Sequence, residues 1–581
     1  MSAAAPQSAA ATNAAAPIAC PAVMPTNQLE PGMAATGYTV SEGTTPQSFS
    51  VEILGVLPDG VAVGRDMIIV EVSSPAIDKA GGIWSGMSGS PVYIGDRLVG
   101  AVAYGLSFGP SKIGGLTPAS DMMDVLSYGS GSGESLQTLT VPEKVTLTEK
   151  QSARIAARAG VSPQKVSSMD RLKLPFGISG VSGPRMKTFQ EAVEREGLPI
   201  IPFSGSSASS GNLAAVGTAD AGDSFAAALS YGDITSAGIG TTTAVCNGKL
   251  LAFGHPFFFE GATRMGANES STITIVDDPA FAPYKLGTVD GLIGAVDQDR
   301  LAAIRADLGD LPELIEIAST VSAVDTKRTR EGSTQAVLSE WVPSLTFTHM
   351  FSNIDVTFDA IAEGSSNLSW TVTGTTASGG PWELTRSNAY FSSRDISFDS
   401  LWELERLMFT LEQNKFEEIE FTGVDVTAEI DADANRYGIK AVKVARNGGR
   451  YRNTKFLNVR RGDLIRLRVT LDSLDASADR VVDLAVRVPR SARGSETLQL
   501  RGEQFAGGVF CLFGRRCADE VGNKIESFDE LIAAFENAPR NDELRAMILG
   551  RNKIKAEDSV LLDQVVRGRK RINLFVSGGG K

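Results

Sequence analysis

Apolar and polar residues alternate over much of the chain, in short runs that are separated by glycine and proline. Such alternation places every second side chain on one face, which is the pattern of a half-buried β-strand. Clear examples lie at residues 354–360 (Ile-Asp-Val-Thr-Phe-Asp-Ala) and 464–469 (Leu-Ile-Arg-Leu-Arg-Val). The chain also holds 60 glycines and 25 prolines, which supply the turns that many short strands need. The pattern therefore predicts a mainly β protein.

Helical signals interrupt this pattern in a few places. Thr148 and Gln151 have the spacing of a capping box, and Gly160 is placed to end the helix that they open. A second helix is expected at about residues 188–196, before Gly197. Two later helices are expected to open at Ser400 and Ser527, the first with an apolar face of Leu401, Leu404, Leu407, Met408 and Leu411.

Length and charge limit the architecture and the partners. A chain of 581 residues is too long for a single hydrophobic core, so several domains are expected. The formal net charge of −13 disfavours nucleic acid, because binding to phosphates needs clustered cations. No apolar run approaches the roughly 20 residues of a membrane-spanning helix. The first two dozen residues are rich in Ala, Ser and Pro, which favours a flexible arm over an intact signal peptide.

The most informative chemistry lies at residues 86–91 (Gly-Met-Ser-Gly-Ser-Pro), a glycine-flanked turn before an apolar strand. Trypsin-like serine peptidases use the same pattern. Glycine two places before the serine lets the chain turn so that both N–H groups point at one spot, and each such donor is worth roughly 3 kcal/mol in the barrier. Ser88 is therefore the candidate nucleophile, and the amides of Gly86 and Ser88 are the candidate oxyanion hole. A plain Gly-Ser hairpin is the alternative.

A serine hydroxyl needs a neighbouring base, and the chain has only two histidines. His255 lies in a turn (Phe-Gly-His-Pro-Phe) after an apolar strand and is the candidate general base. His349 lies in residues 345–351, where alternation predicts an ordinary strand residue. His255 follows Ser88 in the chain, whereas most two-barrel serine peptidases have the histidine first. Since catalytic triads occur in several chain orders, we predict two β half-barrels in swapped order that close on one cleft.

No carboxylate is assigned as the third member of a triad. Such a residue would accept a hydrogen bond from the second imidazole nitrogen and fix the tautomer of the ring. Asp78 is one candidate, and Asp297 and Asp299 are others, although two aspartates beside an arginine are more often a surface turn. A Ser–His dyad, or a backbone carbonyl in place of the acid, also fits the sequence.

Several segments around these residues resemble the SpoIVB-type serine peptidases, the sporulation stage IV B family and its secreted bacterial relatives. The resemblance implies an exported serine endopeptidase in which Ser88 attacks the scissile carbonyl and His255 takes the proton. It places Ser74 where these relatives have a carboxylate, which leaves the acid open. The matching segments are the serine turn and residues 49–57, 66–70, 81–83, 117–118, 238–243 and 251–257.

The same resemblance implies a location outside the cytoplasm, secreted or in the cell envelope. It implies a protein or peptide substrate, with no metal and no organic cofactor; self-cleavage and a cell-envelope partner would both fit. The chain has four cysteines, and an even count in an exported protein allows disulfides. Cys20 could pair with Cys246, and Cys511 with Cys517, and their spacing matches no zinc-binding pattern.

The sequence thus predicts a trypsin-like double β-barrel region followed by a β-sandwich with a few helices. A catalytically inactive peptidase fold that serves as a scaffold or envelope-binding protein is the alternative, because no acid is assigned and the order is reversed. The expected segments are a flexible arm (1–30), a serine-bearing half-barrel (31–128), a linker with helices (129–210), a histidine-bearing half-barrel (211–330), a sandwich (331–500) and a C-terminal helix with closing strands (501–581).

Overall fold

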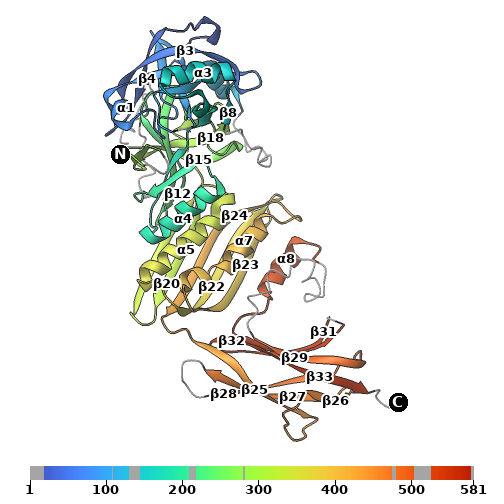
Figure 1. The fold of residues 1–581 in the computed structure, drawn as a ribbon. Coiled ribbons are helices and arrows are strands. Elements are labelled where there is room, and N and C mark those ends of the chain that lie inside the picture. Colours follow the sequence, from blue (N-terminus) through green and yellow to red (C-terminus); the bar gives the residue numbers. More distant parts are fainter. Residues whose placement is uncertain are drawn as a thin grey trace, which may run out of the picture. The chain divides into compact units, whose positions relative to one another are not determined.

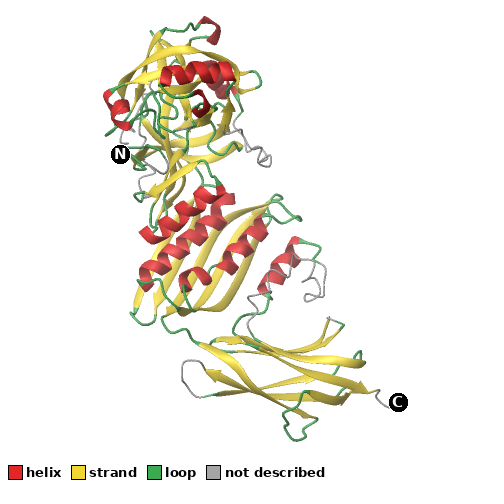
Figure 2. Cartoon of the chain, viewed as in Figure 1, coloured by secondary structure: helices red, strands yellow, loops and turns green. Residues whose placement is uncertain are grey.

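The chain forms two compact units, Met1–Glu313 and Leu314–Lys581, in a computed structural model. Strands dominate both units, and helices lie against them at a few places (Figures 1 and 2). The prediction of a mainly β protein is confirmed. The structure describes residues 19–107, 109–129, 144–208, 218–278, 282–473, 479–502, 525–551 and 553–577.

The first unit begins with a β-barrel of six antiparallel strands. The barrel is closed because β5 pairs with β2 on one side and with β6 on the other. In β2, exposed and buried residues alternate, which turns every second side chain into the barrel core. Around the circuit the strands are β2 (Ala34–Thr39), β3 (Gln47–Ala62), β4 (Arg65–Ser73), β7 (Ile113–Pro118), β6 (Arg97–Leu106) and β5 (Pro91–Ile94).

Short elements surround this barrel. Helix α3 begins at the predicted capping box of Thr148 and Gln151, and it ends at Gly160, whose φ of 67° is left-handed. Residues 19–30 of the expected flexible arm lie along the barrel, where β1 pairs with β6; the rest of that arm is outside the described residues. The added elements are β1 (Ala22–Val23), α1 (Pro75–Ala80), α2 (Ala119–Asp124), β8 (Lys144–Thr146), α3 (Glu149–Ala159) and β9 (Ser168–Arg171).

A second barrel of six antiparallel strands completes the first unit. It is closed because β12 pairs with both β13 and β15. Strand β13 is buried at nearly every position, since both of its faces are covered. The predicted order, with the serine-bearing barrel before the histidine-bearing barrel, is confirmed. Around the circuit the strands are β12 (Ser224–Gly232), β13 (Ser236–Cys246), β14 (Lys249–Ala252), β19 (Ala303–Leu308), β18 (Leu292–Arg300) and β15 (Gly261–Glu269).

Further strands and one helix extend the second barrel. Strand β10 pairs with β13 and carries β11 on its other side, and helix α4 packs on β11. Helix α4 ends at Gly197, as the sequence predicts. The elements are β10 (Leu174–Ile178), α4 (Gly183–Glu196), β11 (Ile200–Ser204), β16 (Thr272–Val276) and β17 (Tyr284–Gly287).

The second unit begins with a sheet whose one face carries three helices (Figure 2). The apolar helix face predicted at residues 401–411 is buried, but Ser400 does not cap the helix as expected; its hydroxyl donates to the carbonyl of Ile396. In sheet order the strands are β21 (Arg328–Ala336), β20 (Ile315–Ala323), β24 (Ile419–Asp431), β22 (Gly364–Thr376) and β23 (Pro381–Ser392), and the helices are α5 (Val342–Phe358), α6 (Ile396–Asp399) and α7 (Trp402–Glu412).

One region expected to be strand is helix. The alternating segments 345–351 and 354–360, with His349, lie largely in α5, so the strand prediction is wrong there. Thr346, His349 and Asn353 are buried together because they recur every three or four residues, which is the helical period. Over a few residues the alternation fits a strand as well as a helix, and only the pattern over the whole of α5 identifies the helix.

Two facing sheets form the predicted sandwich, which starts at β25 rather than at residue 331. Ser527 caps α8 as expected. Cys511 and Cys517 lie outside the described residues, so their pairing stays a prediction. The elements are β25 (Arg436–Arg446), β26 (Phe456–Arg460), β27 (Leu464–Ser473), β28 (Arg480–Arg487), β29 (Gly494–Arg501), α8 (Phe528–Glu536), β30 (Glu543–Gly550), β31 (Lys553–Leu561), β32 (Val565–Arg567) and β33 (Arg569–Ser577).

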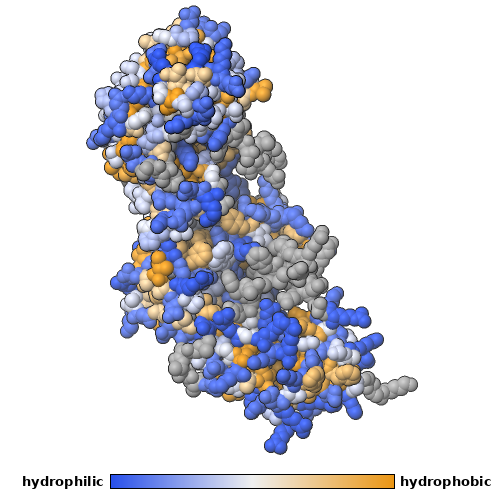
Figure 3. Space-filling model, in the orientation of Figure 1, coloured by the Kyte–Doolittle hydropathy of each residue, from blue (hydrophilic) through white to orange (hydrophobic). Residues whose placement is uncertain are grey.

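The surface is mostly polar. Figure 3 shows hydrophilic residues over most of the visible face of each unit, with apolar residues between them in small groups. Among the described residues, none of the helices combines the length and the apolar character that crossing a membrane requires.

Candidate active site

The serine turn lies between α1 and β5 of the first barrel, pressed against the second barrel. Gly86 and Gly89 have φ values of 100° and 94°, which L-residues rarely adopt. A Cβ on Gly86 would come within 2.6 Å of the Cβ of Lys285, and a Cβ on Gly89 within 2.0 Å of the carbonyl oxygen of Thr241. Only glycine fits at both positions, which explains the glycines of the motif.

Thr241 of the second barrel donates hydrogen bonds to two carbonyl groups of the serine turn. The Thr241 N–H donates to the carbonyl of Ser88 at 2.9 Å, and the Thr241 hydroxyl donates to the carbonyl of Gly86 at 3.0 Å. In the part of the chain that the structure describes, no protein group accepts the N–H of Gly86 or of Ser88. The predicted oxyanion hole needs both of these amides to be without a protein acceptor, and it stays a prediction.

The structure brings Ser88 and His255 together. The Ser88 Oγ lies 2.9 Å from Nε2 of His255, although the two residues are 167 positions apart. The other ring nitrogen, Nδ1, lies 2.8 Å from the carbonyl oxygen of Pro256. A carbonyl can only accept, so Nδ1 carries the proton and Nε2 is left to accept from the Ser88 hydroxyl. A backbone carbonyl thus stands where a triad has its acid.

Both groups are sealed from solvent, with Ser88 and His255 each 0% exposed. Burial lowers the pKa of His255 to about 3, and the positive charge of Arg171 acts in the same direction, while the bond to Pro256 opposes them. The imidazole is therefore neutral at physiological pH, which is the form that can take a proton.

Asp299 supports the histidine turn from β18. Its two carboxylate oxygens accept the N–H groups of Phe257, Phe258 and Phe259 at 2.7 Å each, and that of Glu260 at 3.3 Å. Burial raises the pKa of Asp299, and these four donors offset part of the rise. The bonds fix the backbone directly after Pro256, whose carbonyl orients the imidazole. The expectation of a surface turn at this aspartate is wrong, because Asp299 is 0% exposed.

The other candidates for the acid lie elsewhere. Asp297 forms an ion pair with the buried Arg305. Asp78 pairs with Lys112 at 2.7 Å, and Ser74 caps α1 by accepting from the N–H of Ile77. None of these contacts reaches His255.

Three further residues contact the site, and the sequence analysis assigns none of them a role. The hydroxyl of Thr117 donates to the carbonyl of Gly254, next to His255, and that of Thr243 donates to the carbonyl of Gly89 at 2.7 Å. Both threonines lie in segments that resemble the family, which is the only sequence signal for them.

Lys285 is the third, and it is a fully buried lysine beside the serine turn. Its Nζ lies 3.4 Å from the hydroxyls of Ser224 and Thr241 and from the carbonyl of Gly240. No carboxylate of the described residues pairs with it. Burial lowers the pKa of Lys285 to about 7, because the charged form loses its hydration.

A disulfide joins the N-terminal segment to the second barrel. Cys20 and Cys246 are bonded, as one of the pairings expected from the sequence, and the bond spans 226 positions of the chain. Over the described ranges, no group of three or more His, Cys, Asp or Glu residues is arranged to hold a metal ion.

Comparison with known families supports the resemblance seen in the sequence. Residues 7–117 match the family model described as SpoIVB peptidase S55, a serine peptidase family, and this confirms the predicted resemblance over that stretch. The matched stretch is about a fifth of the chain; it includes Ser88 and Thr117 and ends before His255. No curated protein and no solved structure matches the chain.

Proposed function

We propose that this chain, whose residues 7–117 match the SpoIVB peptidase S55 family, is a serine endopeptidase that works through an acyl-enzyme on Ser88. The observation that carries the proposal is the contact between the Ser88 hydroxyl and the neutral Nε2 of His255, at 2.9 Å. A nucleophile and a base within hydrogen-bond distance, beside a turn with two available amides, are the parts that acyl transfer requires.

The reaction follows from the tautomer. As the Ser88 Oγ attacks the scissile carbonyl, its proton passes to Nε2 of His255, and the oxyanion accepts from the N–H groups of Gly86 and Ser88. The imidazolium then donates the Nε2 proton to the leaving amine. Water attacks the acyl-enzyme in the second half, with His255 again as base and then as acid. Through these steps the Nδ1–H stays bonded to Pro256, which holds the ring in place.

Cleavage needs a rearrangement that admits substrate, since Ser88 and His255 are both fully buried. A site that opens only for a fitting polypeptide would restrict cleavage to few substrates or to the chain itself. We further propose that the protein acts outside the cytoplasm, in the secreted fraction or the cell envelope. The disulfide between Cys20 and Cys246 supports this, because such bonds persist in oxidising compartments.

A fluorophosphonate probe tests the activity without knowledge of the substrate, since it reacts with activated serines. We expect the full-length protein to become labelled and the Ser88→Ala variant to stay unlabelled. Circular dichroism of both proteins controls for folding. A folded protein that the probe does not label would contradict the peptidase and favour the alternative, an inactive peptidase fold with a scaffold or binding role in the envelope.

A further inference from the structure

A groove on the first barrel carries no role in the proposed chemistry. It is a cavity of about 290 Å³ between strand β3 and helix α3, near the lower end of the range for ligand pockets. Its floor is apolar and comes from Leu54, Leu57, Ile69, Leu147 and Ile155. Neither Ser88 nor His255 lines it, so it is separate from the candidate active site.

The backbone along this groove is an open sheet edge. Strand β2 pairs with β3 only as far as Glu52, and Gly32 and Met33 then bond the backbone of Ile53. Beyond that point, β3 pairs with β4 alone among the described strands. Alternate residues of the stretch 54–57 therefore have backbone N–H and C=O groups on the side away from β4, where a further strand can add.

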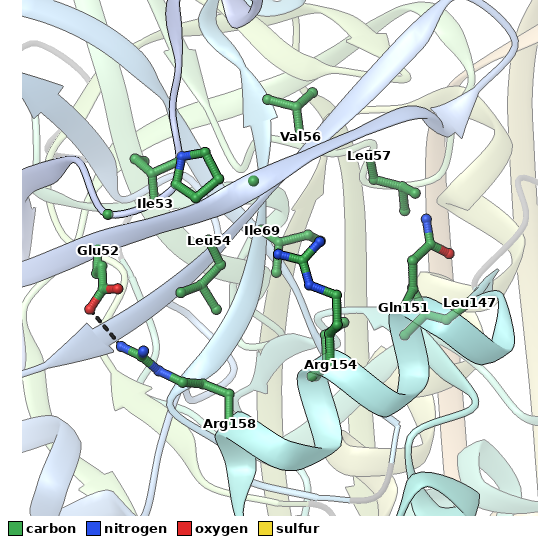
Figure 4. A pocket seen from close by; sticks show the side chains of 14 residues that line it. Glu52, Ile53, Leu54, Val56, Leu57, Ile69, Leu147, Gln151, Arg154 and Arg158 are labelled. Atoms are coloured by element: carbon green, nitrogen blue, oxygen red, sulfur yellow. Dashed lines mark hydrogen bonds and ion pairs between the residues drawn. The ribbon is translucent and has the colours of Figure 1, made fainter.

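One of the two arginines that line the groove has no carboxylate bonded to it among the described residues. Arg158 is bonded to Glu52 at 2.6 Å and also to Glu71, so both of its nearby carboxylates are already engaged and its charge is not open to a ligand. Arg154, one turn earlier in α3, makes no ion pair with any described residue. Figure 4 shows its guanidinium pointing from α3 toward β3, above Leu54 and Ile69, while Arg158 turns toward Glu52.

We propose that this groove binds an extended peptide, which adds a strand to the free edge of β3 and places a carboxylate on Arg154. Apolar side chains at every second position of the peptide would enter the cavity, because alternate residues of a strand point to the same face. The open edge favours a peptide over a small anion or a fatty acid, since only a polypeptide satisfies the backbone groups of residues 54–57. The carboxylate is a C-terminus or an acidic side chain.

The test uses the full-length chain with Ser88→Ala, so that the result does not depend on the proposed peptidase activity. The probes are pools of fluorescein-labelled hexapeptides with a free C-terminus and varied apolar residues at alternate positions, measured by fluorescence anisotropy. We expect saturable binding that Arg154→Ala weakens about tenfold or more, because a charge-assisted hydrogen bond is lost. Lys150→Ala, on the same helix but outside the groove, is the matched control and leaves binding unchanged.

Modified peptides separate strand addition from other binding. N-methylation of one alternate set of amides should abolish binding, and methylation of the other set should be tolerated, because only one edge of the peptide faces β3. The proposal is wrong if no pool shows binding that depends on Arg154, or if both methylated sets bind equally. Saturable binding of dodecanoate without peptide binding, or dimerisation that Arg154→Ala removes, would assign the groove to another occupant and overturn it.

Discussion

The two units each contain a buried histidine bonded to a serine hydroxyl, and only one of these pairs has the surroundings of a catalytic site. His255 Nε2 lies 2.9 Å from the Ser88 Oγ, and His349 Nε2 lies 2.8 Å from the Ser319 Oγ. Both histidines are 0% exposed. Distance and burial therefore do not distinguish the pairs.

The backbone around the serine distinguishes the Ser88–His255 pair from the Ser319–His349 pair. Ser319 lies within β20, opposite Gly332 on one side and Val426 on the other, so its strand is paired along both edges. Ser88 lies in a turn whose glycines take left-handed φ values, and no described protein group accepts its N–H or that of Gly86. A Ser–His hydrogen bond in a sheet supports packing, whereas the same bond beside two available amides can support acyl transfer.

The strongest test of this difference is to remove the imidazole of His255 and that of His349 in separate variants. We expect His255→Ala to slow labelling by a fluorophosphonate at least about 10³-fold, because the variant removes the base that we propose for Ser88. His349→Ala should leave the labelling rate within about twofold and lower the unfolding temperature, since the hydroxyls of Ser319 and Thr334 lose their buried partner. Rates are measured by in-gel fluorescence. Equal losses in both variants would show that the two pairs do not differ in role.

Asp299→Asn tests whether the bonds from Asp299 to the turn after Pro256 hold His255 in position. The amide offers one acceptor oxygen where the carboxylate offers two for four N–H groups, so the turn after Pro256 should shift. We expect the labelling rate to fall about 10²-fold, which is the usual cost of a small misplacement in a site. Asp297→Asn is the matched control on the same strand, and it should cost stability without slowing labelling. A full rate in Asp299→Asn would remove this aspartate from the account.

Part of this site could be predicted from the sequence, and part of it could not. Gly86, Ser88 and His255 stand in short motifs whose chemistry is local, and the capping box of α3 is local too. Asp299 acts through N–H groups about 40 positions away, and no spacing rule reports such a contact. Helix α5 was misassigned because polar and apolar residues alternate over a few positions within a longer helical period. Chemistry carried by a short motif can be predicted from one sequence, whereas a contact between residues far apart in the chain cannot.

Burial of Lys285 should make the unfolding free energy of the first unit depend on pH. Its pKa is about 7 in the folded state against about 10.5 when unfolded, so the unfolded chain binds more protons between these values. This lysine should therefore make stability rise with pH across that window, by up to about 1.4 kcal/mol per pH unit. Urea unfolding followed between pH 7 and 10 measures the slope.

The matched variants decide whether Lys285 causes that slope. Lys285→Met should remove most of the slope, and Lys249→Met, which changes a partly exposed lysine of the same unit, should keep it. An unchanged slope in Lys285→Met would mean that another group causes it.

The smallest expected effect belongs to Thr243→Val. The variant keeps the shape of the side chain and removes the hydroxyl that donates to the carbonyl of Gly89, leaving a buried acceptor without a partner. We expect a loss of about 1 kcal/mol in unfolding free energy and less than a tenfold change in labelling rate. A larger rate loss would mean that the serine turn depends on this one bond more than on those from Thr241.

The tautomer of His255 is the most direct measure of whether its ring can act as the base for Ser88. With two histidines in the chain, ¹⁵N-histidine NMR resolves both rings, and a His349→Gln variant assigns them. We expect His255 to be neutral from pH 7 down to about 5, with its proton on Nδ1 and an Nε2 resonance that shifts in Ser88→Ala. A proton on Nε2, or a charged ring at pH 7, would contradict the account, because neither form can accept the serine proton.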